Sequence, residues 1–183
     1  MLLNLSNQNL TTVPVIKDDI TELDLSNNKI KTIPESCFPK GLRKLWLNNN
    51  DISELTENCF PNELTNLWLN NNNISNPKKE YFPKELQQLY MYDNEIKNLP
   101  QECFPEKFQT LHLSYNEDSN ICDGYFPSQL KELWLKHIAV TMTNPVYTLQ
   151  NPEFTHLSRG TSIFIAKVDG KLVQTPYGQI FMS

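Results

Sequence analysis

Glycine, cysteine and histidine are scarce in this chain, and their scarcity excludes several classes of site. The 183 residues include only 5 glycines, 4 cysteines and 3 histidines. No glycine-rich phosphate loop, H-E-x-x-H motif or C-x-x-C motif occurs in the sequence. We therefore expect no metal site, no cofactor and no catalytic residues, and a protein that is not an enzyme.

Positive charge and long apolar runs are also lacking. The formal net charge is −5, whereas nucleic-acid-binding domains usually present a basic face. Apolar runs such as residues 163–166 are far shorter than the roughly 18 residues of a membrane span. The first residues lack the basic and apolar regions of a secretory signal. We therefore expect neither a nucleic-acid nor a membrane partner, and a cytoplasmic location.

Leucine and asparagine, by contrast, are abundant and periodic. The chain has 24 leucines and 22 asparagines. Asparagines recur at intervals of 22 residues, at Asn28, Asn50, Asn72, Asn94 and Asn116. The unit reads F-P-x-x-L-x-x-L-x-L-x-x-N-x-I and runs without insertion from residue 21 to residue 137. Such a repeat predicts a solenoid, in which each copy buries its leucines against its neighbours.

Each position of the unit has a physical interpretation. In L-x-L the two leucines point to one side, as in a strand, and stacked copies form a parallel sheet. The asparagine lies where the chain turns away from the strand, so its amide can pair with backbone groups at the bend. Repeated copies predict a ladder of asparagine hydrogen bonds. The phenylalanine fills the outer half of the core, and the proline after it favours extended backbone.

This unit resembles the leucine-rich repeat family over residues 1–137, and stretches such as residues 39–47 are similar to the short repeats of secreted bacterial effectors. The resemblance implies the α/β class: a leucine-rich repeat solenoid of about seven repeats, with a concave parallel sheet. Its convex side would be extended chain and short 3-10 turns. It also implies a protein partner and an effector acting in the host cytosol; a viral or protist repeat protein is the alternative.

The two ends of the chain depart from the repeat. In residues 138–183 the pair Asp169-Gly170 lies between alternating apolar residues, which predicts a β-hairpin. We expect this segment to cap the core of the solenoid formed by residues 1–137. At the other end, the first strand would be an open edge that can pair with another chain, which allows a homodimer.

One column of residues on the sheet is unusually aromatic. The middle residue of L-x-L faces away from the core, and in successive repeats it is Asn4, Asp24, Trp46, Trp68, Tyr90, His112 and Trp134. All three tryptophans of the chain lie in this aromatic column, which we define as Trp46, Trp68, Tyr90, His112 and Trp134. Tyr92 and Tyr115 flank it. We predict that these seven residues bind a partner, because exposed aromatic rings are typical of binding hot spots.

Alternatives to a protein partner remain open. The rings could serve only to stiffen the sheet by stacking across strands. A row of aromatic rings also suits the binding of carbohydrate, and the aromatic column or the open first strand could mediate self-association. Thiol chemistry is a weaker reading, because Cys37, Cys59 and Cys103 share one phase that tyrosine occupies in other repeats. That position is therefore interpreted as a packing position with reduced thiols.

Overall fold

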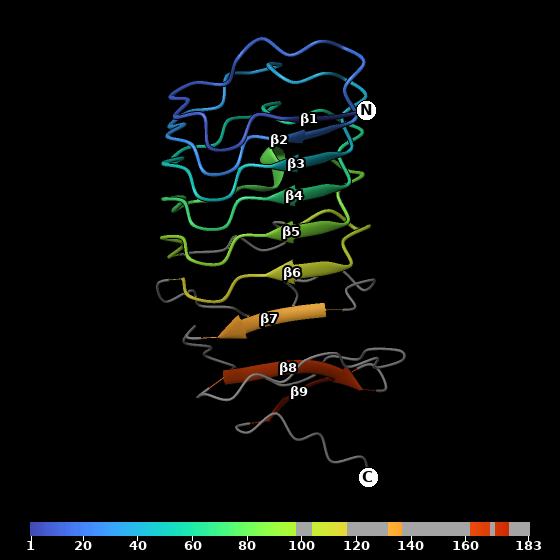
Figure 1. Ribbon diagram of the computed structural model, residues 1–183. Coiled ribbons are helices and arrows are strands. Elements are labelled where there is room, and N and C mark those ends of the chain that lie inside the picture. Colours follow the sequence, from blue (N-terminus) through green and yellow to red (C-terminus); the bar gives the residue numbers. More distant parts are fainter. Residues whose placement is uncertain (98–103, 117–131, 137–161, 169–170, 176–183) are drawn as a thin grey trace.

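The chain winds into a solenoid whose strands lie along one side. The computed structural model describes residues 1–97, 104–116, 132–136, 162–168 and 171–175. Figure 1 shows the strands stacked as successive layers, one from each turn of the coil. In parallel order they are β1 (Leu2–Asn4), β2 (Glu22–Asp24), β3 (Lys44–Trp46), β4 (Asn66–Trp68), β5 (Gln88–Tyr90), β6 (Thr110–His112) and β7 (Glu132–Lys136).

Two antiparallel strands follow the parallel series. β8 (Ser162–Val168) pairs with β7, and β9 (Lys171–Thr175) pairs with β8. The predicted turn at Asp169-Gly170 lies outside the described residues, as does the predicted domain boundary between residues 137 and 138. That residues 138–183 cap the solenoid therefore stays a prediction.

The core is a set of leucine rows created by the constant period. Leu23, Leu45, Leu67, Leu89 and Leu111 are opposite one another in the strand register and have no exposed surface. Phenylalanines form a second row, in which the rings of Phe38 and Phe60 stack with their centroids 6.4 Å apart. Because every turn has the same length, equivalent residues meet, and the core continues from turn to turn.

The predicted asparagine ladder is confirmed. Asn72 is buried; its Nδ2 donates to the carbonyl oxygens of Leu47 and Leu69, each at 3.0 Å, and its Oδ1 accepts from the N–H of Ile52 at 3.0 Å. The same arrangement recurs at Asn28, Asn50, Asn94 and Asn116. These side chains satisfy backbone groups of two neighbouring turns where the strands end, and so fix one turn on the next.

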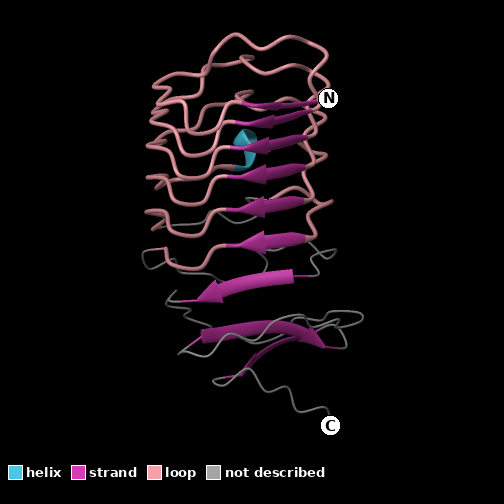
Figure 2. Ribbon diagram, viewed as in Figure 1, coloured by secondary structure: helices cyan, strands magenta, loops and turns pink. Residues whose placement is uncertain are grey.

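Among the described residues, helix is nearly absent from the side opposite the strands. Their one helical element is the 3-10 turn η1 (Lys79–Tyr81), and loops form the rest of the described part of that side (Figure 2). The parallel sheet and the 3-10 convex turn agree with the predicted solenoid, but the α/β class overstates the helix. The reason lies in the length of the repeat, since a turn of 22 residues leaves room for little more than a strand and two bends.

Candidate functional site

The strand register brings the aromatic column together. Trp46 is opposite Trp68, Trp68 opposite Tyr90, and Tyr90 opposite His112, which is opposite Trp134. All five side chains are half-buried, whereas the apolar residues on either side of Trp46, Trp68, Tyr90 and His112 (leucines, and Met91 after Tyr90) are buried in the core. Alternation along each strand thus turns the rings to the outer face of the sheet, as the sequence predicts.

The first three rings of the column form a regular stack. The ring centroids of Trp46 and Trp68 are 4.7 Å apart and their planes are inclined by 12°. The ring centroids of Trp68 and Tyr90 are 5.5 Å apart and their planes are inclined by 2°. The spacing matches the distance of about 4.8 Å between strands. Each ring therefore covers a face of its neighbour, and the ring edges are what the stack presents to a partner.

The stack changes at His112. Its ring meets Tyr90 edge-on, at 6.4 Å and 69°, and lies at a tilt against Trp134, at 5.5 Å and 41°. Tyr92 turns in from the end of β5 and lies 4.5 Å from the His112 ring. The His112 Nε2 is 3.0 Å from the Ser114 Oγ. Burial lowers the pKa of His112 to about 4, so that its imidazole is neutral at pH 7.

Tyr115 occupies a turn rather than a strand. It is 42% exposed and follows β6, in the same phase of the repeat as Asn27, Asn49, Asn71 and Asp93. All five residues have a left-handed backbone, with φ between 52° and 57°. Asparagine and aspartate tolerate this conformation, whereas a bulky side chain does so at a cost. The binding role predicted for Tyr115 therefore coincides with a conformation that tyrosine disfavours.

Polar residues continue the column beyond Trp46. Asp24 lies opposite Trp46, and Asn4 lies opposite Asp24. The Asp24 Oδ1 accepts hydrogen bonds from the N–H of Ser26 at 2.9 Å and from its Oγ at 2.6 Å. Asn4 holds Ser6 in the same way, at 2.9 and 2.8 Å. The prediction from sequence omitted this end of the column from the site; the shared N/D-x-S pattern was the signal for it.

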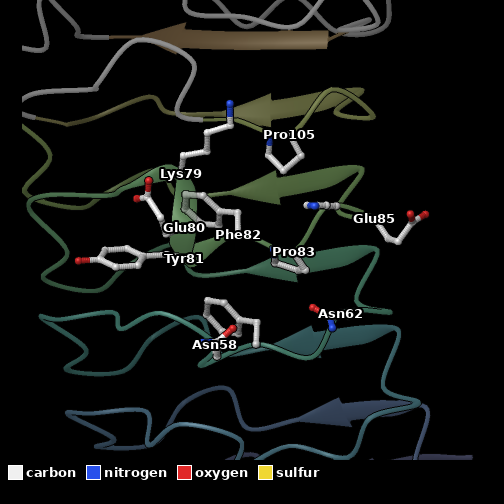
Figure 3. A pocket seen from close by; sticks show the side chains of 11 residues that line it. Asn58, Asn62, Lys79, Glu80, Tyr81, Phe82, Pro83, Glu85 and Pro105 are labelled. Atoms are coloured by element: carbon white, nitrogen blue, oxygen red, sulfur yellow. The ribbon is translucent and has the colours of Figure 1, made fainter.

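A hollow of about 580 Å³ lies away from the column (Figure 3). It is formed by η1 and by the Phe-Pro segments that precede β4, β5 and β6. Its floor includes the buried rings of Phe60 and Phe82. Two of its lining side chains have cationic partners: Glu85 pairs with the Lys107 Nζ at 2.7 Å, and the Tyr81 ring lies 5.8 Å from the Lys78 Nζ. Because these two lining groups already have partners, we place the functional site on the aromatic column.

Titratable side chains of the described residues bear on metal and thiol chemistry. No cluster of three or more His, Cys, Asp or Glu side chains there could hold a metal ion. Cys37 and Cys59 are free thiols, and burial raises their pKa values to about 11 and about 12. Over the same residues, no helix is both long and apolar enough to cross a bilayer.

Comparison with known proteins agrees with this architecture. Residues 18–62 match the family model described as Leucine Rich repeats (2 copies). Two leucine-rich repeats are thus recognised in residues 18–62, which contain β2 and β3. No curated protein matches the sequence significantly. The assignment to a subfamily, such as that of the bacterial effectors, therefore rests on the sequence resemblance alone.

Two solved structures show the same fold. The leucine-rich repeat domain of APL1B is similar with a TM-score of 0.69 and 23% identity, over 77% of this chain and 45% of that chain. The TLR13–ssRNA13 complex contains a chain similar with a TM-score of 0.58 and 26% identity, over 77% of this chain and 20% of that chain. This chain thus spans less than half the length of either. Leucine-rich repeat domains are typically non-enzymatic modules that bind other proteins.

Proposed function

We propose that this chain is a non-enzymatic module that binds a partner protein through the aromatic column, together with Tyr92 and Tyr115. The observation that carries the proposal is the unbroken succession of ring contacts from Trp46 to Trp134 on the outer face of the sheet. Tryptophan and tyrosine are enriched in binding hot spots because they bury much area for few rotatable bonds.

The stacking favours a protein partner over a carbohydrate. A sugar ring stacks on the flat face of an aromatic ring, but the faces of Trp68 are covered by Trp46 and Tyr90. Aromatic ring edges offer C–H groups instead, and indoles also carry an N–H donor; both suit the mixed apolar and carbonyl surface of a polypeptide. Stacking also stiffens the sheet, so that little side-chain entropy is lost when a partner binds.

The test is affinity capture from cytosolic extract with the full chain and with the double variant Trp68→Ala, Trp134→Ala. We expect the double variant to lose the captured protein, because two of the five rings of the column are removed while the buried leucines stay in place. The matched control is the double variant Arg43→Ala, Glu63→Ala, which removes an exposed ion pair outside the column. Capture that survives the loss of both tryptophans would contradict the proposal.

Two further measurements separate the alternatives. Binding on a glycan array that depends on Trp68 would favour carbohydrate. A molar mass in light scattering that doubles with concentration, and halves again in the double variant, would favour self-association through the column. The cytoplasmic location and the effector role stay predictions from the sequence.

A further inference from the structure

We propose that the aromatic column ends in a subsite for a basic side chain of the partner, formed by the carboxylate of Asp24 and the free face of Trp46. This inference rests on the proposed function and names the chemistry of the partner at one end of the site. A segment bound along the column would then carry apolar side chains over β4 to β6 and an arginine or lysine over β2 and β3.

The ring geometry leaves one face of Trp46 open. Its stacking contact with Trp68 covers the face on the β4 side. Among the described residues no other aromatic ring or cation contacts Trp46, and its neighbour on the β2 side is Asp24. The Asp24 side chain is much shorter than an indole and is held toward Ser26 by two hydrogen bonds. The column is therefore lower at Asp24 than at Trp46, and one face of the Trp46 indole borders the space above Asp24.

The negative charge of Asp24 is not needed for the local structure. Asn4 occupies the equivalent position one turn earlier and makes the same two hydrogen bonds to Ser6 that Asp24 makes to Ser26. An amide oxygen therefore suffices to hold this turn. The hydrogen bonds to Ser26 therefore do not explain why position 24 carries a charged carboxylate and not a neutral amide.

No cation of the described residues neutralises this charge. Lys44 lies on the neighbouring strand, but its Nζ pairs with the Glu22 Oε1 at 3.0 Å. The side-chain hydrogen bonds of Asp24 within the described part of the chain are those to Ser26, and both use its Oδ1. His112 is neutral at pH 7 because burial lowers its pKa. Asp24 is thus the single formal charge in the run of side chains from Asn4 to His112 at neutral pH.

A basic side chain satisfies both halves of the subsite. A cation over the face of tryptophan is attracted by the ring, and the effect is largest for this ring type. A guanidinium fits particularly well, because its plane can lie along the indole while its edge donates to the carboxylate. Because Asp24 is half-buried, its attraction to such a cation is screened less than that of a fully exposed ion pair.

The experiment is selection of a phage-displayed library of random dodecapeptides on three immobilised full-length proteins. These are the wild type, Asp24→Asn, and the double variant Trp68→Ala, Trp134→Ala. Asp24→Asn is the matched change, because Asn4 shows that asparagine holds the turn. Its thermal midpoint should equal that of the wild type, which verifies that the turn is intact.

We expect the wild type to select peptides with apolar or aromatic residues and a basic residue at a fixed spacing from them. Asp24→Asn should lose the preference for the basic residue, and should bind a wild-type-selected peptide about tenfold more weakly. Selection of apolar peptides without a fixed basic residue, or a basic preference unchanged in Asp24→Asn, would overturn the subsite and leave the proposed function standing. Equal selection by the wild type and the tryptophan double variant would overturn both.

Discussion

Asn50 and Ile30 are joined across two turns of the solenoid: the Asn50 Oδ1 accepts a hydrogen bond from the N–H of Ile30 at 3.0 Å. The same amide donates through Nδ2 to the carbonyl oxygens of Leu25 and Leu47. One buried side chain therefore satisfies three backbone groups that water does not reach. The chain can bend sharply after the strand because this asparagine replaces the missing backbone partners.

Removal of one side-chain amide from this ladder should therefore lower the free energy of unfolding. We expect Asn72→Ala to lower the free energy of unfolding by about 2–4 kcal/mol, because it leaves two carbonyls and one N–H buried without partners. The adjacent Asn73 is exposed, and Asn73→Ala should cost less than about 0.5 kcal/mol. Urea unfolding followed by circular dichroism measures both. Equal losses in the two variants would contradict the structural role of the ladder.

Tyr115 should be replaceable with a gain in stability. Its φ of 57° lies in the region that asparagine tolerates and tyrosine does not. We expect Tyr115→Asn to raise the free energy of unfolding by about 1 kcal/mol, or roughly 2–4 °C in thermal midpoint. The reciprocal change Asn71→Tyr should lower it, and should also break the hydrogen bond from Asn71 to Asn49. If Tyr115→Asn is stabilising but weakens partner capture, the strain at this tyrosine is retained for binding.

His112 should make the solenoid less stable in mild acid. Burial lowers its pKa from 6.5 to about 4 in the folded state, so between these values the unfolded chain takes up the proton and the folded chain does not. Stability therefore falls as the pH falls through this window, by about 1–2 kcal/mol once the partial exposure of the ring is allowed for.

The variant His112→Phe isolates this effect, because it keeps a ring in the column and removes the proton. The difference in free energy of unfolding between wild type and variant, measured in urea at pH 7, 6, 5 and 4.5, should shift steadily against the wild type as the pH falls. Acidic residues titrate in both proteins and cancel from the difference. A difference that does not change with pH would show that the His112 pKa is unshifted.

The two described thiols should resist alkylation in the folded protein. With pKa values of about 11 and about 12, Cys37 and Cys59 are almost entirely protonated at pH 8, and only a thiolate attacks iodoacetamide. Peptide mass spectrometry after a short exposure should find both unmodified in buffer and both modified in urea. Modification of Cys59 at the same rate in both conditions would contradict its burial.

The sequence alone determined the repeat, the leucine rows, the asparagine ladder and the alignment of the aromatic column. A constant period is a translational symmetry: once one strand is placed, residues 22 positions apart must meet, as Leu45 meets Leu67 and Trp46 meets Trp68. Alternation along the strand then decides which of these rows is buried. These features need no knowledge of side-chain packing.

Only the tertiary structure decided what the column presents to a partner. Three features depend on side-chain torsions: the indoles stack face to face, His112 tilts and has a lowered pKa, and Asp24 turns to Ser26 beside an open face of Trp46. Those torsions are selected by neighbours one turn away and by the water they exclude. The period of the sequence fixes the position of each residue on the backbone, but the neighbouring side chains decide which rotamer it adopts.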